Sequence, residues 1–324
     1  MPGLPASIPH VPLASFPTPV EELLNLRELL SATGATIPRL LVKRDDAIGF
    51  AFGGNKVRKM QLVAADALKQ GADTLITSGG VQSNHARVTA AAAAKLGMRS
   101  ILVANGTPPE RPTANALLDR LLGAEIRYVA DRSQRAQEME YAAEELRLFG
   151  RRPYVIPIGA STPLGAAGFV QAVFELLQQI EPPDVIVHST SSGGTQAGLV
   201  AGCLLASVHT RVIGVSADES SATLERDIRA ILSGLERLLG LEAGLFAAAE
   251  VVVDDTWVGG GYGVPTDPSR EAIDIAARSE ALFLDPTYTS KAMAAVIAGC
   301  RRGDFSGVGT LLFWHTGGQV GLFA

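Results

Sequence analysis

The strongest constraint on the fold is a regular alternation of short apolar segments with longer amphipathic ones from about residue 57 onward. Apolar strands are predicted at 74–77, 100–104, 125–129, 153–157, 184–188, 211–216 and 310–314. Helical spacing of apolar residues predicts helices over 57–70, 83–96, 113–122, 133–149, 164–180, 195–207, 221–240, 268–281 and 288–300. Strands separated by helices indicate βαβ units, and near-continuous apolar strands indicate sheets covered on both faces. The expected fold class is α/β, with open, mostly parallel sheets.

Composition excludes several classes of protein. At roughly 150 residues per domain, 324 residues predict about two domains. Apolar residues make up 47% and charged residues 19%, unlike a disordered chain. The net charge of −5 and the absence of basic runs argue against a nucleic-acid partner. The sequence shows neither a signal-peptide pattern nor an apolar run long enough for a bilayer, so we expect no membrane partner and a cytoplasmic location.

The two cysteines, Cys203 and Cys300, lie in apolar helical segments. We expect buried thiols in a reducing compartment rather than a disulfide. No cluster of histidine, cysteine and carboxylate residues has the spacing of metal ligands, and no metal is expected.

The segment Gly53-Gly54-Asn55-Lys56-Val57-Arg58-Lys59 places basic residues at the start of a predicted helix. The positive end of the helix dipole disfavours cations there. A bound anion, or an amine kept partly neutral, would relieve the conflict, and a Schiff-base lysine beside a phosphate group provides both. Lys59 lies on the same helix face as Lys56 and could hold that anion. A basic helix start that points into solvent is an equally good interpretation of the spacing alone.

Other polar clusters follow predicted strands, where parallel sheets bind their ligands. Hydroxyls and glycines at 189–195 predict a small phosphate cradle. Neither a Walker lysine nor a GxGxxG fingerprint accompanies them, which argues against nucleotide sites. The cluster 79–85 is longer than a helix cap needs, although capping by Ser83 or Asn84 is the alternative. Clusters at 259–265, 285–288 and 315–318 are further candidates, with ordinary surface turns as the alternative. The combination favours pyridoxal 5′-phosphate as cofactor.

A set of motifs then carries a resemblance to a known family: KRDD at 43–46, GGNKVRK at 53–59, QSNHAR at 82–87, GGTQAG at 193–198, GYGVP at 261–265, DPTYTSKAM at 285–293 and HTGG at 315–318. Over nearly its whole length the chain resembles the D-cysteine desulfhydrase and 1-aminocyclopropane-1-carboxylate (ACC) deaminase family of pyridoxal-phosphate enzymes. The resemblance implies fold type II, similar to the tryptophan synthase β subunit, with two open, mostly parallel twisted sheets flanked by helices. It implies a large cofactor-binding domain of residues 1–49 and 166–324, a small domain of residues 50–165 inserted in it, and a homodimer.

The resemblance also assigns roles to individual residues. Lys56 would form the Schiff base, Asn84 would bond the cofactor's 3′ oxygen, and Thr316 would lie near the pyridine nitrogen. The residues expected to bind the cofactor are Lys56, Lys59, Asn84, Ser192, Gly193, Gly194, Thr195 and Thr316. The expected catalytic residues are Lys56, Ser83, Tyr262 and Tyr288. The residues expected to bind the small amino-acid substrate are Ser83, Asn84, His85, Tyr262 and Tyr288.

The activity implied by the resemblance is α,β-elimination of D-cysteine to pyruvate, ammonia and hydrogen sulfide. ACC deaminases tend to carry Gln and Glu where this chain has His85 and Thr289, which favours the desulfhydrase branch. ACC deamination and L-cysteate sulfo-lyase activity are the alternatives, and an amino-acid sensor without turnover is a rival from another class. In the hypothesised mechanism Lys56 removes the α-proton and Tyr288 protonates the leaving sulfur. The chain departs from its relatives at Ala114 and Ser191, where glycine is usual.

Overall fold

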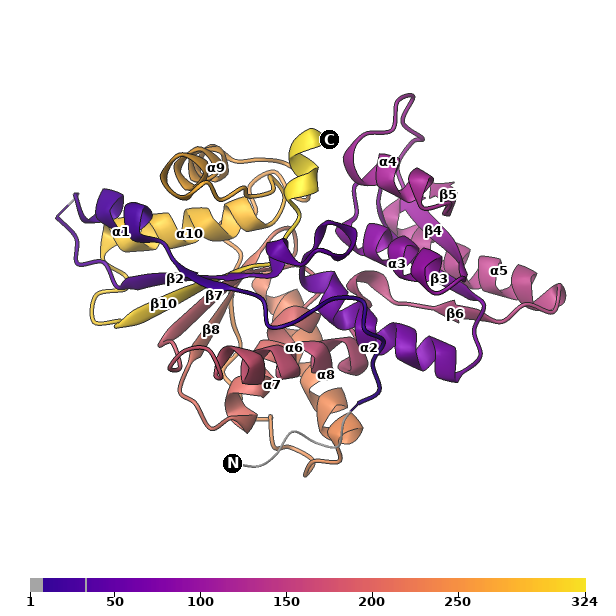
Figure 1. Cartoon of the computed structure of the whole chain (residues 1–324), viewed down its shortest axis with the longest axis horizontal. Helices are drawn as coiled ribbons and strands as arrows, with labels where there is room; N and C mark the ends of the chain where they lie inside the picture. The colour runs from indigo at the N-terminus through magenta and orange to yellow at the C-terminus, as the bar shows by residue number, and fades with distance from the viewer. Residues whose placement is uncertain (1–7, 33) are drawn as a thin grey trace.

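The computed structural model describes residues 8–32 and 34–324, and its strands form two sheets (Figure 1). The larger sheet has the order β1 (Val20–Glu22), β2 (Arg39–Arg44), β10 (Thr310–His315), β7 (Val185–Thr190), β8 (Arg211–Ser216) and β9 (Val252–Asp254). Its strands are parallel except at the β1–β2 edge. The smaller sheet is parallel throughout, in the order β5 (Glu125–Val129), β4 (Arg99–Asn105), β3 (Thr74–Gly80) and β6 (Pro153–Val155). The predicted fold class is confirmed.

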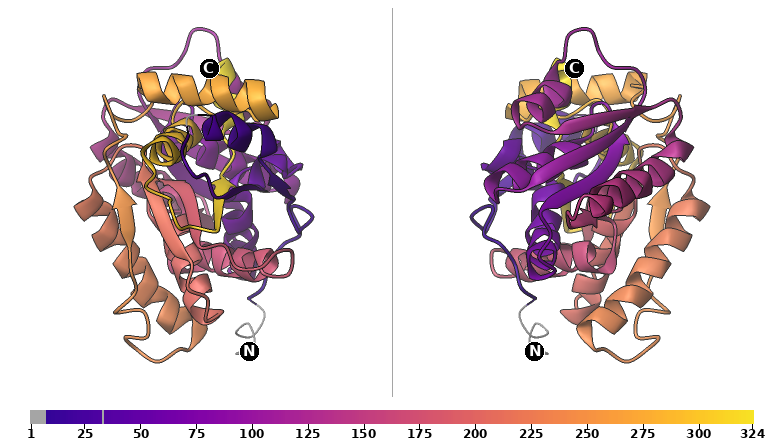
Figure 2. Two further views of the ribbon diagram at one scale, coloured as in Figure 1. Left: turned by 90° about the vertical axis from the view of Figure 1, so that its left-hand side faces the viewer. Right: turned by 90° about the vertical axis from the view of Figure 1, so that its right-hand side faces the viewer.

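Helices cover both faces of each sheet, as the two side views illustrate (Figure 2). On the larger sheet, one face carries α6 (Pro163–Leu176), α7 (Gly194–Leu205) and α8 (Ser221–Leu239). The opposite face carries α1 (Leu24–Ser31), α9 (Asp267–Glu280) and α10 (Thr289–Arg302). On the smaller sheet, one face carries α2 (Asn55–Lys69) and α3 (Asn84–Lys95), and the opposite face carries α5 (Arg135–Leu148). Helix α4 (Ala114–Leu121) packs against α3.

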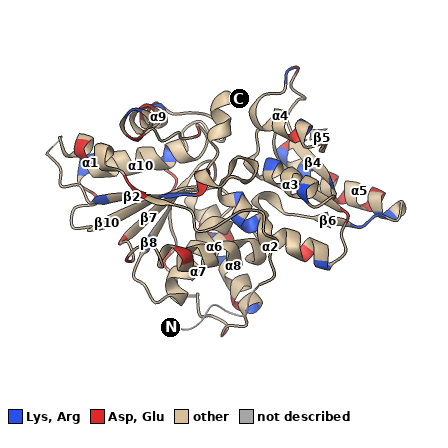
Figure 3. Cartoon of the chain, viewed as in Figure 1, with Lys and Arg blue, Asp and Glu red and all other residues tan. Residues whose placement is uncertain are grey.

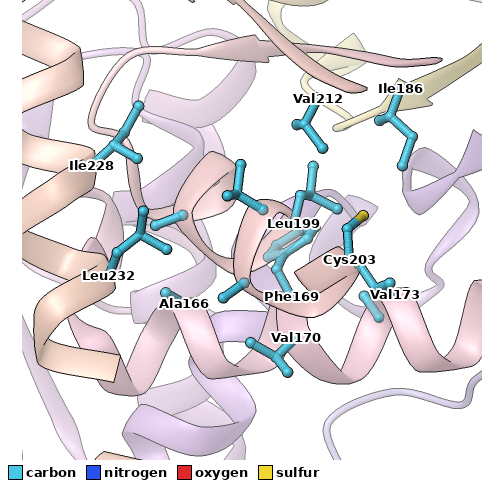
Figure 4. Packing of buried hydrophobic residues seen from close by; sticks show 14 of the residues in the cluster. Ala166, Phe169, Val170, Val173, Ile186, Leu199, Cys203, Val212, Ile228 and Leu232 are labelled. Carbon is cyan, nitrogen blue, oxygen red and sulfur yellow. The ribbon is translucent and has the colours of Figure 1, made fainter. Parts of the chain in front are cut away.

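The largest apolar core lies between the larger sheet and helices α6, α7 and α8 (Figure 4). Phe169 and Trp314 are fully buried there and meet edge to face, with ring centroids 5.8 Å apart. Burial of each large apolar side chain contributes about 1.5–3 kcal/mol. Cys203 belongs to this core, and both Cys203 and Cys300 are buried free thiols, as predicted. Burial raises the pKa of Cys203 to about 12, so its thiol is unreactive.

A buried charge cluster joins α2 to the larger sheet, and the basic positions near the start of α2 lie at the centre of the molecule (Figure 3). The Arg58 guanidinium donates to both carboxylate oxygens of Asp45 at 2.9 Å and 2.8 Å. It also donates to Glu175 at 2.7 Å, and Glu175 accepts a 2.6 Å bond from Lys43. Two cations therefore face two carboxylates, and the balance stabilises α2 in one orientation. Arg58 lies two residues after Lys56, so the same contacts hold Lys56 in place.

The structure extends the predicted alternation toward the N-terminus. β1, α1, β2 and β9 were not expected from the sequence; β1 and β9 have only three residues each and lie at sheet edges. The helix expected at 164–180 ends at Leu176. All strands of the smaller sheet fall within residues 50–165, and the domain division itself stays a prediction. Across the described residues, no helix has both the length and the apolar character required to cross a membrane.

Candidate active site

A cavity of about 870 Å³ lies between the carboxyl ends of the strands of the two sheets. Most of the predicted site residues line it: Lys56, Ser83, Asn84, His85, Ser192, Gly193, Thr195, Tyr262, Tyr288 and Thr316. Two others, Lys59 and Gly194, lie immediately behind the wall, where both contact the lining residue Ser161. Segments far apart in the sequence are therefore brought into one site, as open parallel sheets allow.

Lys56 lies in the first turn of α2, directly after Gly53 and Gly54, which have positive φ angles of 71° and 100°. Its amine lines the cavity and has no hydrogen bond or ion pair with any described residue. Burial lowers the pKa of Lys56 to about 8 because nothing compensates for the lost hydration of the charge. The neutral, nucleophilic form of this amine is therefore far more populated near neutral pH than in an ordinary lysine.

The N-terminus of α7 and the Lys59 side chain form a polar cradle. Lys59 Nζ donates to Gly159 O at 3.1 Å and to Ser161 Oγ at 3.3 Å, and Ser161 Oγ lies 2.7 Å from Ser192 Oγ. These partners are uncharged, and Lys59 is only 1% exposed. Burial lowers the pKa of Lys59 well below its ordinary value, and the charge of Lys56 adds to the effect. An anion bound in the cradle would balance the positive charge of the Lys59 ammonium group and favour its protonated form.

Gly194 leaves the space that such an anion needs. A Cβ at position 194 would lie 2.7 Å from Ser161 Oγ and 2.9 Å from Lys59 Nζ, so only glycine is accommodated. Backbone N–H groups at a helix N-terminus favour phosphate. The hydroxyl of Thr190, which lines the cavity, is buried without a hydrogen-bond partner. The residues present thus fit the phosphate group of pyridoxal phosphate.

The loop before α3 brings Ser83 and Asn84 to the cavity. Ser83 Oγ accepts a hydrogen bond from Ala86 N at 3.2 Å, so its hydroxyl does cap the helix. It also lines the cavity, because β3 ends in glycine: a Cβ on Gly79 would lie 2.4 Å from Ser83 Oγ. Ser83 therefore both caps α3 and lines the cavity.

Asn84 is oriented by two buried neighbours. Its Oδ1 accepts from Arg87 Nη1 and from Asn115 Nδ2, each at 2.9 Å. With the oxygen satisfied, the Asn84 amide nitrogen remains as a donor for a ligand in the cavity. Ala114, which directly precedes Asn115 at the start of α4, adopts a φ of 46°. The position where relatives usually have glycine thus has a glycine-like backbone in this chain as well.

His85 is buried and neutral. Thr77 Oγ1 donates to Ile156 O, so it accepts from His85 Nε2 at 2.8 Å, and Nδ1 is left as an unpaired acceptor. Burial lowers the pKa of His85 well below its ordinary value, and the nearby amines of Lys56 and Lys59 add to the effect. His85 therefore offers a lone pair rather than a charge.

Tyr262 and Tyr288 form a hydroxyl pair, with their oxygens 2.7 Å apart and their rings edge to face. Burial raises the pKa of Tyr288 well above its ordinary value, and the interaction with Tyr262 adds to the rise. Asp285 Oδ2 accepts from the backbone N–H of Tyr288 at 2.9 Å, which fixes the start of α10. Thr289 is fully buried, and its hydroxyl donates to Asp285 Oδ1 at 2.6 Å.

Thr316, at the end of β10, contributes an uncharged hydroxyl. Its Oγ1 lies 2.8 Å from Ser189 Oγ, and its carbonyl accepts from Asn55 N at 3.0 Å. Both hydroxyls line the cavity close to the start of α2. The group expected beside the pyridine nitrogen is therefore neutral.

Several lining residues were absent from the predicted site. Ser161 follows β6 in a Gly-Ala-Ser-Thr segment, a strand-end cluster of small residues that could have been recognised. Asp218 follows β8 in the same way. Arg135 comes from α5, and no local pattern marks it. Arg132 and Glu219 both line the cavity and form an ion pair, which no sequence signal predicts because the partners are 87 residues apart.

Residues 11–317 match the family model described as pyridoxal-phosphate dependent enzyme. The chain belongs to this family. A solved structure described as an ACC deaminase homologue is 36% identical, with a TM-score of 0.89 over 98% of this chain and 94% of that one. The predicted family resemblance, fold type II and cofactor are thereby confirmed.

Solved structures of lower sequence identity share the fold. A fungal L-serine ammonia-lyase from Rhizomucor miehei is 18% identical, with a TM-score of 0.69 over 95% of this chain and 94% of that one. A pyridoxal 5′-phosphate-dependent aspartate racemase is 17% identical, with a TM-score of 0.67 over 93% of this chain and 90% of that one.

Proposed function

We propose that this pyridoxal-phosphate enzyme is a carbon–sulfur lyase that converts D-cysteine to pyruvate, ammonia and hydrogen sulfide. Lys56 would hold the cofactor covalently, and Lys59 with the segment 192–195 would hold its phosphate. Asn84 would bond its 3′ oxygen, and Thr316 would face its pyridine nitrogen. When bound, the cofactor supplies a ring that stabilises negative charge at the substrate α-carbon.

The protein's own residues supply the proton transfers. Lys56 Nζ, whose pKa burial lowers to about 8, accepts the proton from the substrate α-carbon. The carbon–sulfur bond then breaks, the sulfur takes the bonding electrons, and Tyr288 Oη donates a proton to it. Tyr262 Oη, 2.7 Å away, hydrogen-bonds to that donor and stabilises the phenolate that forms. Water then hydrolyses the three-carbon product to pyruvate and ammonia.

The observation that carries the choice of substrate is the environment of Thr289. The Thr289 hydroxyl is hydrogen-bonded to the backbone N–H and the carboxylate of Asp285. Thr289 is not among the residues that line the cavity. Position 289 therefore presents no acid to the substrate, where ACC deaminases tend to carry Glu. Neutral His85 is the second difference from that branch. Both support the desulfhydrase, while the ACC deaminase homologue among the solved structures supports the wider group.

Purified holoenzyme tests the proposal. D-cysteine should release pyruvate and sulfide in equal amounts, and Lys56→Ala should remove both the turnover and the visible absorption band that borohydride bleaches. ACC, assayed as 2-oxobutanoate, and L-cysteate, assayed as sulfite, are the alternative substrates. Absence of both pyruvate and sulfide from D-cysteine would refute the desulfhydrase assignment even if the band is present.

We also propose that the enzyme is a homodimer. Phe52, Leu121 and Phe323 leave 57%, 72% and 75% of their surface exposed. Leu121 is on α4, which contacts the C-terminal segment η5 (Gln319–Phe323), and Figure 1 shows these elements together at one side of the molecule. Large exposed apolar side chains on neighbouring elements are typical of interfaces. Light scattering should give twice the chain mass, and Leu121→Glu with Phe323→Glu should give the monomer.

A further inference from the structure

Lys291 has an unusual environment for a buried cation. It lies in the first turn of α10, one turn after Tyr288, and is only 1% exposed. Its Nζ donates to three backbone carbonyls: Ala217 O at 2.9 Å, Val258 O at 2.8 Å and Gly261 O at 2.9 Å. All three ammonium N–H groups are therefore used. Within residues 8–32 and 34–324, Lys291 makes no ion pair with a carboxylate.

This position is electrostatically unfavourable for an ammonium group. The N-terminal end of a helix dipole repels cations, and burial removes the hydration of the charge. The carboxylates of Asp218 and Asp285 favour the charge without touching it, and the direct contacts of the amine are the three carbonyl oxygens, whose dipoles point at it. Such a cage of backbone oxygens recognises an ammonium ion by its charge and its N–H groups together.

The three carbonyls belong to segments that the lysine joins. Ala217 directly follows β8, whereas Val258 and Gly261 lie in the turn that leads into Tyr262. This turn is held weakly by its own backbone: Gly261 N to Val258 O and Val264 N to Gly261 O each measure 3.3 Å. The hydrogen bonds from Lys291 are shorter and are made by a charged donor, so they contribute most to holding this turn in place.

We propose that Lys291 is a positioning residue, which clamps the turn carrying Tyr262 so that its hydroxyl meets Tyr288, and that the carbonyl cage accepts a free ammonium or methylammonium ion when the side chain is removed. Tyr288 is the N-cap residue of α10 and Lys291 lies in the first turn of that helix, so the start of α10 positions both tyrosines. The expected fall in kcat rests on the proposed function and the role of Tyr262 in it, whereas the expected loosening of the turn does not.

The test compares Lys291→Met with Lys95→Met, a control at an exposed lysine. In Lys291→Met, backbone hydrogen exchange over residues 258–264 should be at least about tenfold faster, since about 1.4 kcal/mol of local stability corresponds to that factor. Methylammonium chloride should restore protection, and tetramethylammonium chloride, which has no N–H, should not. The kcat for pyruvate formation should fall and recover in parallel, with KM changing less. The same salts on the unsubstituted enzyme correct for inhibition by the salts themselves.

A Tyr262→Phe background shows whether the lysine acts through the tyrosine. Lys291→Met should lower kcat much less there than in the unsubstituted enzyme, and an equal loss in both backgrounds would overturn the proposal. Unchanged hydrogen exchange over 258–264 would overturn it as well, whatever the substrate. Failure of the proposed function is a separate result, namely no pyruvate from the unsubstituted enzyme.

A second variant covers the case in which Lys291→Met does not fold. Lys291→Gln keeps amide N–H donors and should show intermediate exchange and partial rescue by methylammonium. A Gln variant with unchanged exchange and kcat would refute the clamp. If both variants stay unfolded even with methylammonium present, Lys291 is a requirement of the fold, and its assignment as a positioning residue is wrong.

Discussion

The hydroxyl oxygens of Tyr262 and Tyr288 lie 2.7 Å apart, although the two residues come from different segments of the larger sheet's rim. One hydroxyl must donate to the other, so one of the two hydroxyl protons lies between the two oxygens. Burial raises the pKa of Tyr288, which keeps its proton in place at neutral pH.

The tyrosine pair predicts a non-additive effect on turnover. Tyr288→Phe should lower kcat for pyruvate formation by about 10²–10⁴, the usual value of general acid catalysis. Tyr262→Phe should lower it less, and the double variant should be no slower than Tyr288→Phe alone. Stopped-flow and steady-state assays with D-cysteine measure this. Multiplied losses in the double variant would show that the hydroxyls act independently.

The low pKa of Lys56 predicts how the cofactor-free protein binds pyridoxal phosphate. Only the neutral amine attacks the aldehyde, and burial lowers the pKa of Lys56 to about 8. The rate of band formation should therefore rise with pH and level off above about pH 8. A rate that keeps rising toward pH 10.5 would show a normally hydrated amine. Lys56→Ala is the control that should form no band.

Asn115 does not line the cavity, but its substitution should still lower the affinity for the cofactor. Asn115→Ala removes one of the two donors that hold Asn84 Oδ1, so the Asn84 amide should lose its fixed orientation. Affinity for pyridoxal phosphate should fall about tenfold, which corresponds to one hydrogen bond. Titration of absorbance measures it, with exposed Asn25→Ala as the control. Equal affinities in the two variants would exclude the role given to Asn115.

Ala114 predicts a stabilising substitution. A non-glycine residue with φ of 46° stores strain, so Ala114→Gly should stabilise the protein by about 1 kcal/mol. The same change at Ala136, an exposed residue in α5, should destabilise it by about 0.5–1 kcal/mol. Urea denaturation of both variants measures the difference. Destabilisation by both would mean that Ala114 is not strained.

The buried charge cluster predicts acid sensitivity. Arg58 and Lys43 hold the pKa of Glu175 at about 2 against the opposing effect of burial. Because the folded-state pKa is depressed, this stabilisation is complete above about pH 4.5 and is lost as the pH falls toward 2. Glu175→Gln should destabilise the protein by about 3–5 kcal/mol at neutral pH. The stability of this variant should also fall less steeply than that of the unsubstituted protein as the pH drops from about 4.5 toward 2. Glu271→Gln, at an exposed ion pair, should cost about 1 kcal/mol or less.

How much the sequence could predict depends on the range of each interaction. The cap formed by Ser83 and the helix start at Lys56 are local, so the spacing of a few residues reveals them. The strand-end segment around Ser161 is a local signal that was overlooked, but the contacts of Ser161 with Lys59 and Gly194 could not be predicted because these residues are distant in the chain. Edge strand β1 was missed because three residues carry too little periodicity.

The ion pair between Arg132 and Glu219 in the cavity lining has a consequence for the entry and exit of ligands. The arginine is 54% exposed and the glutamate 30%, so water can replace each partner at little expense. Separating them costs on the order of 1 kcal/mol, less than a tenfold change in population. A small ligand therefore enters and leaves the cavity at nearly the same rate whether or not this exposed ion pair is formed.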